Sequence, residues 1–197
     1  MPKPVLAVDF DDVVAGFNQA FARWHNEYYG TSVEYDDIYS YDMALTYSTD
    51  KETILHRVFE FSHHHHHRVE PLYDAIESLR VLKRKYSLLI VTSRCESIAQ
   101  VTRDWKQRHA AILFDGAHYA NGFTILHPER KRLKSEICVT LGAIAHIDDA
   151  VSHANEVVTG AGIPVFLPTR PWNKGAELVS GVIRVDGWVE ITKQLLS

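Results

Sequence analysis

The sequence of 197 residues has few cysteines, no long apolar run and no excess of basic residues. Cys95 and Cys138 are too few for a disulfide framework or, alone, a structural zinc site, so we expect both to be reduced in or near the core. No run of 18 apolar residues occurs, so we expect no membrane-spanning helix. A net charge of −4 argues against a general nucleic-acid-binding protein, which would present a basic face. Acidic residues interrupt the N-terminal stretch where a signal peptide would stay apolar, which favours a cytoplasmic protein.

Short apolar runs alternate with helical patterns along most of the chain. We interpret as strands the runs at residues 4–9, 87–92, 111–114, 143–147, 163–167 and 182–185. Helical patterns separate or follow them at 71–85, 96–108, 129–141, 150–159 and 187–196. Strands that alternate with helices predict an α/β fold in which a doubly wound parallel sheet has helices on both faces.

The stretch between the first two strands breaks this alternation. It contains helical patterns at 15–29 and 51–61, joined by a Tyr/Asp-rich connection at 35–47. A crossover between parallel strands needs only about a dozen residues. We therefore predict a small helical cap at residues 16–70, called the insert below, within a core domain of residues 1–15 and 71–197. The insert contains the histidine run His63–His67, of which at most two or three members could converge on one metal ion if the run is helical.

Reactive side chains follow the predicted strands at their carboxyl ends, where open α/β sheets bind ligands. The first run ends in Asp9 and is followed by Asp11 and Asp12; Lys134 lies on the helix that leads into a later strand. The other strand-end residues are Thr92, Ser93, Arg94, Asp148 and Asp149. Asp9 and Asp11 would point to opposite faces of a regular strand. The chain must therefore turn sharply after Asp9 if both carboxylates serve one site.

Clustered carboxylates repel one another and need a cation, and oxygen ligands beside a phosphate favour Mg²⁺. A carboxylate can attack phosphorus to give an aspartyl-phosphate, and a second acid can protonate the leaving oxygen and later activate water. Each signal also has a purely structural interpretation. Thr92, Ser93 and the Asp148–Asp149 pair could cap helices, and Lys134 competes with Lys131 and Arg132 on a basic helix face.

Taken together, these motifs resemble those of the haloacid dehalogenase (HAD) superfamily across residues 4–150. DFDDV at 9–13 is similar to the first motif of that superfamily, VTSR at 91–94 to the second, Lys134 to the third and HIDDA at 146–150 to the fourth. The resemblance implies a Rossmann-like core with Asp9 as the nucleophile and Asp11 as the general acid/base. It implies that Thr92 binds the transferring phosphoryl group and that Lys134 neutralises the charge of that group. It further implies that Mg²⁺ is held by Asp9, the Asp11 carbonyl and the Asp148–Asp149 pair, with Asp149 as the direct ligand.

The segment DFDDVVAGFNQAF at 9–21, followed by a helical insert, looks like the 5′(3′)-deoxyribonucleotidase branch of that superfamily. This resemblance implies that Phe17 stacks on a nucleobase, and we place Ser93 and Arg94 with it as substrate-binding residues. Phe17 also belongs to an aromatic stripe with Phe21, Trp24 and Tyr28 whose spacing is typical of a helix core; Tyr41 and Tyr47 are further candidates. The chain departs from the branch in having Asp12 for Gly, Gly16 for Asp and Arg94 for Pro.

We therefore predict a Mg²⁺-dependent phosphoric monoester hydrolase that acts on nucleoside monophosphates. The partner is a small phosphorylated metabolite, and neither a nucleic acid nor a membrane is expected. The first alternative is the same chemistry on another small phosphate, such as a sugar phosphate or phosphoglycolate. A second is a phosphate-binding protein without turnover. A third, dehalogenation, is disfavoured because attack on carbon needs no Mg²⁺.

Overall fold

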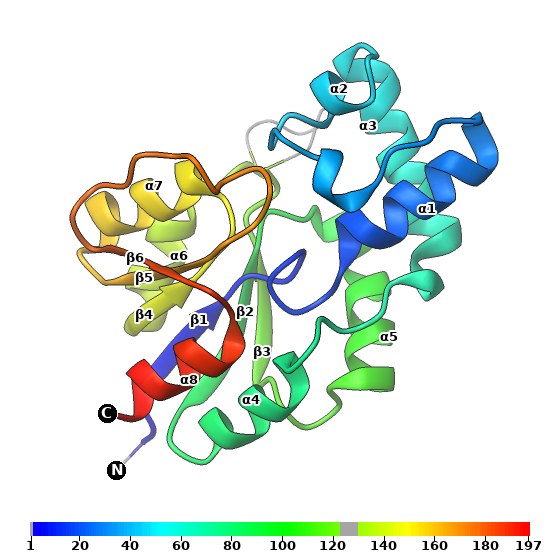
Figure 1. The fold of residues 1–197 in the computed structure, drawn as a ribbon. Coiled ribbons are helices and arrows are strands. Elements are labelled where there is room, and N and C mark those ends of the chain that lie inside the picture. Colours follow the sequence, from blue (N-terminus) through cyan, green and yellow to red (C-terminus); the bar gives the residue numbers. More distant parts are fainter. Residues whose placement is uncertain (1, 123–129) are drawn as a thin grey trace.

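The computed structural model describes residues 2–122 and 130–197, and its centre is a six-stranded parallel sheet (Figure 1). The strands lie in the order β3-β2-β1-β4-β5-β6. Their bounds are β1 Val5–Val8, β2 Ser87–Thr92, β3 Gly116–Tyr119, β4 Ala143–Ile147, β5 Val165–Pro168 and β6 Val182–Val185. The chain builds outward from β1 to β3 and then returns to start again at β4. This confirms the doubly wound sheet, whose ligand crevice lies where the order switches, between β1 and β4.

Successive side chains of β1 point to opposite faces of the sheet, and each face carries its own helices. Leu6 and Val8 belong to a core with α4 (Ala75–Lys83), α5 (Ala99–His109) and α8 (Trp188–Leu196). Ala7 belongs to a second core with α6 (Lys134–Leu141) and α7 (Val151–Ala161). The central strand is therefore buried on both sides, which accounts for its uninterrupted apolar sequence.

The strand predicted at 111–114 is wrong. These residues form a turn in which Leu113 and Phe114 are buried and Ile112 is 86% exposed. The strand that pairs with β2 is β3, Gly116–Tyr119, a half-buried edge strand. The apolar content of 111–114 reflects the packing of a turn under α5, whereas an edge strand needs less apolar sequence. The helix predicted at 129–141 begins at Lys134, and its residue 129 lies outside the described residues.

The insert contains α1 (Phe17–Tyr29), α2 (Met43–Thr46) and α3 (Lys51–Glu60), which lie beyond the carboxyl ends of the strands (Figure 1). A short 3₁₀ turn at Tyr35–Asp37 precedes α2, and a π turn at Phe61–His65 and a 3₁₀ turn at His66–Arg68 lead the chain back to the sheet. The aromatic stripe of α1 forms the centre of the insert: the Phe21 ring contacts Tyr47 and Phe61 edge-on. Trp24 is fully buried, whereas Tyr28 is 51% exposed.

The two chain segments that join the insert to the sheet run side by side. The Gly16 N–H donates to the Glu70 carbonyl (2.9 Å), and the Leu72 N–H donates to the Val14 carbonyl (2.8 Å). Ala15 forms isolated bridges with both Asp11 and Pro71. The catalytic-loop candidate at 9–15 is thereby hydrogen-bonded to the segment through which the insert returns.

Candidate active site

The structure places Asp9, Thr92 and the Asp148–Asp149 pair at one edge of the sheet. The register aligns Val8 with Ile90 and Ile147, so the residues after β1 and β4 and the last residue of β2 lie close together. The chain turns sharply after Asp9, because the N–H groups of Val14 and Ala15 both donate to the Phe10 carbonyl (3.0 Å). Asp12 stands where the 5′(3′)-deoxyribonucleotidase branch has Gly. It adopts a left-handed conformation (φ 54°), which aspartate tolerates better than most residues.

Lys134 bridges two of these carboxylates in the interior of the protein. Its Nζ lies 3.0 Å from Asp9 Oδ2 and 2.7 Å from Asp148 Oδ2, and its side chain is about 1% exposed. Lys131 and Arg132 are exposed. Of the three candidates Lys131, Arg132 and Lys134, Lys134 is thus the one that faces Asp9, and its buried charge offsets the two carboxylates.

Asp148 and Asp149 are adjacent but occupy different electrostatic environments. Burial alone would raise the pKa of Asp148, but the Lys134 charge, the hydrogen bond from His146 and the nearby His153 ring, whose Nδ1 lies 3.7 Å from Asp148 Oδ1, hold that pKa well below its usual range. The Asp148 carboxylate also accepts from the Ala150 N–H (2.9 Å). Burial, followed by the charges of Asp148 and Asp9, raises the pKa of Asp149 well above its usual range. The protein therefore stabilises the ionised form of Asp149 less than that of Asp148, and a bound cation would stabilise Asp149 more.

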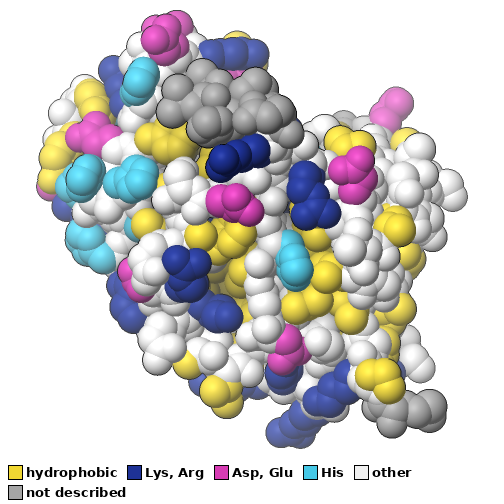
Figure 2. All heavy atoms as spheres, turned by 180° about the vertical axis from the view of Figure 1, so that it is seen from behind, with side chains coloured by type: hydrophobic (Ala, Val, Ile, Leu, Met, Phe, Trp, Pro, Cys, Tyr) yellow, Lys and Arg dark blue, Asp and Glu magenta, His cyan; other side chains and the backbone are white. Residues whose placement is uncertain are grey.

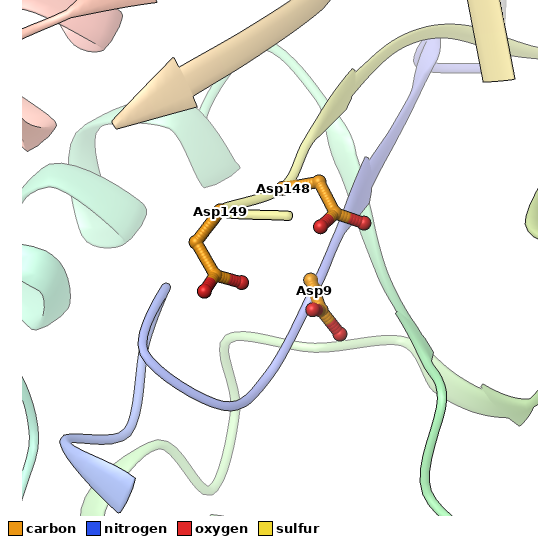
Figure 3. Close-up of side chains that lie close together, drawn as sticks. All are labelled: Asp9, Asp148 and Asp149. Carbon is orange, nitrogen blue, oxygen red and sulfur yellow. The ribbon is translucent and has the colours of Figure 1, made fainter. Parts of the chain in front are cut away.

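The carboxylates of Asp9, Asp148 and Asp149 lie together at the ends of β1 and β4 (Figure 3). One oxygen from each lies within 4.8 Å of the other two, and all three residues are buried. Asp9 Oδ1 is buried without a hydrogen-bond partner, and burial raises the pKa of Asp9. An unpartnered hard oxygen beside two further carboxylates fits a divalent cation such as Mg²⁺. Among residues 2–122 and 130–197, this is the one group of three or more potential ligands close enough to share an ion.

A cavity of about 380 Å³ opens on this cluster. Its sheet end is polar, with Asp9, Asp11, Asp12, Thr92, Ser93, Arg94 and Asp149. Its insert end is mostly apolar, with Phe17, Tyr41, Met43, Ile54, Leu55, Val58 and Phe59. The structure thus brings Phe17, Ser93 and Arg94 to the same cavity as Asp9. Tyr47 is not among the residues that line it and is buried in the insert.

Two residues of the cavity have partners that the sequence does not reveal. Both oxygens of the Asp11 carboxylate accept hydrogen bonds from Arg94, at 2.7 Å each. The Ser93 hydroxyl lies 3.5 Å from His153 Nε2.

His66 is the one buried member of the histidine run, whereas His63, His64 and His67 are exposed. Seen from behind, histidine side chains gather at the left of the surface, and another lies apart from them near the centre (Figure 2).

Sequence reasoning missed a loop that follows β5 and supports the site. Trp172 Nε1 donates to Asp149 Oδ2 (2.8 Å) and Asn173 Nδ2 donates to the Asp149 carbonyl (2.8 Å). Arg170 Nε donates to the Asp12 carbonyl in the turn after β1 (2.9 Å). The signal was available, because TRPWN at 169–173 follows a predicted strand at the same edge of the sheet.

The chain matches known proteins along nearly its whole length. Residues 3–196 match the family described as 5′ nucleotidase, deoxy (pyrimidine), cytosolic type C protein. A Bacillus subtilis (strain 168) protein named "Putative nucleotidase YqfW" is 23% identical over 195 residues, covering 94% of this chain and 90% of that protein.

Solved structures show the same fold at low identity. A haloacid dehalogenase-like hydrolase from Streptococcus pneumoniae, SP0104, is 16% identical, with a TM-score of 0.69 over 98% of both chains. A Bacillus subtilis HAD hydrolase, YfnB, solved bound to magnesium, is 13% identical, with a TM-score of 0.64 over 100% of both chains. No helix of the described residues is long and apolar enough to cross a bilayer. The match over residues 3–196 shows that the chain belongs to the type C 5′ nucleotidase family of HAD hydrolases, and hence that it is a phosphoric monoester hydrolase.

Proposed function

We propose that this protein is a Mg²⁺-dependent phosphatase of nucleoside monophosphates that works through a phosphorylated Asp9. One observation carries the proposal: a single cavity joins the buried carboxylate cluster at its sheet end to an apolar, aromatic wall from the insert. A phosphate at the polar end and a planar base against the wall match this polarity. The family description and the name of the Bacillus subtilis relative support a nucleotide substrate, and the word "cytosolic" in the former supports a cytoplasmic location.

The proposed reaction is two in-line phosphoryl transfers. In the first, an Asp9 oxygen bonds to phosphorus, the bond from phosphorus to the ester oxygen breaks, and the Asp11 proton moves to that leaving oxygen. In the second, Asp11 takes a proton from water as the water oxygen bonds to phosphorus and the Asp9–phosphorus bond breaks. Lys134, 3.0 Å from Asp9, offsets negative charge at the attacking carboxylate, and Thr92 contacts the phosphoryl group. Positioning and charge neutralisation supply most of the catalysis in such transfers.

Asp9, Asp149 and the Asp11 carbonyl are the proposed Mg²⁺ ligands. Asp148 belongs to the same cluster, but its carboxylate already accepts hydrogen bonds from Lys134, His146 and the Ala150 N–H. It is therefore better suited to hold Lys134 in place. When bound, Mg²⁺ would neutralise phosphate charge and orient the phosphoryl group. The magnesium-bound fold relative supports this choice of ion.

Phosphate release from a panel of substrates tests the proposal. We expect nucleoside monophosphates to be hydrolysed at least about tenfold faster than sugar phosphates or phosphoglycolate, a preference the apolar wall would supply. EDTA should abolish the reaction and added Mg²⁺ should restore it. Activity confined to sugar phosphates would keep the chemistry and discard the nucleotide. If folded protein with Mg²⁺ releases no phosphate from any substrate of the panel, a phosphate-binding protein without turnover is favoured.

Replacing Phe17 with leucine tests whether the insert recognises the base. Phe17 lines the cavity and stacks on Phe21 with ring centroids 5.9 Å apart. Stacking of a base on an aromatic ring is worth about 1–3 kcal/mol, so we expect KM for nucleotides to rise about tenfold. KM for phosphate esters that carry no base, such as a sugar phosphate, should not change. Tyr28→Leu, on the exposed end of the same helix, is the matched control and should leave both values unchanged.

A further inference from the structure

We propose that Arg94 is a positioning residue for the Asp11 carboxylate and that His66, from the insert, holds Arg94 in place. The inference rests on the proposed function, in which Asp11 transfers the proton to the leaving oxygen. It gives Arg94 a role other than direct contact with substrate. It also gives one member of the histidine run a place in the site.

All three guanidinium nitrogens of Arg94 are hydrogen-bonded to other residues of the protein. Its Nε and Nη2 bind the two Asp11 oxygens at 2.7 Å each, and its Nη1 donates to Thr102 Oγ1 on α5 (3.1 Å). The Arg94 side chain is 3% exposed, whereas that of Asp11 is 29% exposed. A bidentate fork fixes the plane of a carboxylate. Each Asp11 oxygen keeps a further lone pair on which to carry a proton.

His66 completes the arrangement from the insert. Arg94 Nη2 lies 2.6 Å from His66 Nε2, and because a guanidinium only donates, Nε2 must be the unprotonated acceptor. Burial, followed by the charges of Arg94 and Arg108, lowers the pKa of His66 to about 2, which keeps the ring neutral. The Phe10 ring stacks on His66 with centroids 6.4 Å apart and lies 4.5 Å from the Arg94 guanidinium.

Arg94 thereby connects three segments. It follows β2, and it binds the turn after β1 through Asp11, α5 through Thr102 and the returning segment of the insert through His66. The orientation of Asp11 consequently depends on where the insert places His66. A displaced insert would remove the acceptor that fixes one edge of the guanidinium.

Leaving-group dependence distinguishes a positioning role from phosphate binding. The ratio kcat/KM reports steps up to departure of the leaving group, in which Asp11 protonates the alkoxide of a nucleotide. p-Nitrophenolate departs without a proton. General acid catalysis contributes about 10²–10⁴-fold. We therefore expect Arg94→Gln to lower kcat/KM about 100-fold for a nucleoside 5′-monophosphate and less than about fivefold for p-nitrophenyl phosphate.

Further variants separate charge from geometry. Arg94→Lys should show the same selective loss, because lysine keeps the charge but lacks the fork. His66→Phe keeps a ring against Phe10 but removes the acceptor, and we expect a selective loss of about tenfold. His64→Phe, at an exposed position in the same run, is the matched control. His66→Phe also keeps the inference testable if the Arg94 variants fail to fold.

Equal losses on both substrates, with a raised KM that Arg94→Lys restores, would overturn the positioning role and make Arg94 a phosphate-binding cation. No selective loss in His66→Phe would overturn the part played by the insert. Wild-type protein that releases no phosphate from either ester in an Asp9-dependent way would overturn the proposed function itself. By contrast, an active wild-type protein whose variants lose activity equally on both substrates would overturn only the roles given to Arg94 and His66.

Discussion

Asp9→Asn should reduce phosphate release at saturating nucleotide and Mg²⁺ by at least about 10⁴-fold, the scale seen when a nucleophile is removed. An amide of the same shape is a poor nucleophile towards phosphorus. The protein should fold at least as stably as the wild type in EDTA. Burial raises the pKa of Asp9, so its ionised form opposes folding at neutral pH, and asparagine removes that charge. Lys134 keeps its hydrogen bond to Asp148 (2.7 Å).

Trapping the phosphorylated intermediate tests the role of Asp9 as nucleophile without relying on a reaction rate. We expect Asp11→Asn, incubated with p-nitrophenyl phosphate, to accumulate one phosphoryl group on the peptide that contains Asp9, because the variant lacks the base that activates water. Mass spectrometry after an acid quench detects the added group. Asp104→Asn, an exposed carboxylate on α5, is the control for both measurements. If Asp9→Asn keeps activity within about tenfold of wild type, Asp9 is not the nucleophile.

Lys134→Met should destabilise the metal-free protein by about 3–5 kcal/mol, the cost of leaving a buried charge without its partner. Without the ammonium group, Asp9 and Asp148 would face each other across the interior with no cation between them. The same change removes the positive charge beside the attacking oxygen. Loss of one such electrostatic group typically lowers kcat about 10²–10³-fold.

Urea unfolding, with EDTA and with Mg²⁺, measures the effect on stability. We expect Mg²⁺ to stabilise Lys134→Met more than wild type, because the ion would offset carboxylates that no longer have a lysine. Lys131→Met, three residues earlier and exposed, removes the same charge from the same segment and should change neither stability nor kcat. A Lys134→Met protein that is as stable as wild type in EDTA would show that the buried pairs contribute little.

The sheet edge that carries the site could be predicted from the sequence because its information is local. Each of β1, β2 and β4 is a buried apolar run with polar residues directly after it, and parallel strands bring those residues to one edge. The bounds of β1 and β4 were predicted within a residue. The position of β3 was not, because half-buried Gly116–Tyr119 has little apolar signal.

Contacts between distant segments were beyond local reasoning. Arg94 and Asp11 are 83 residues apart, and Arg94 and His66 are 28 apart. A motif predicts which residues reach the crevice, but the length and flexibility of an arginine side chain leave its partner undetermined. The same holds for Trp172, whose bond to Asp149 depends on the path of the loop after β5. The loop's place at the sheet edge was predictable, whereas its hydrogen bonds were not.

The paired segments on either side of the insert constrain how the protein could open and close. Because Gly16 is bonded to Glu70 and Val14 to Leu72, the two segments cannot slide or twist independently without breaking backbone hydrogen bonds. The two segments therefore act as one hinge, about which the insert can rotate relative to the sheet around a single axis. The insert also touches α7, where the Tyr41 ring meets His153 edge-on with centroids 5.7 Å apart, so a motion that lifts the insert away from α7 must break this contact as well.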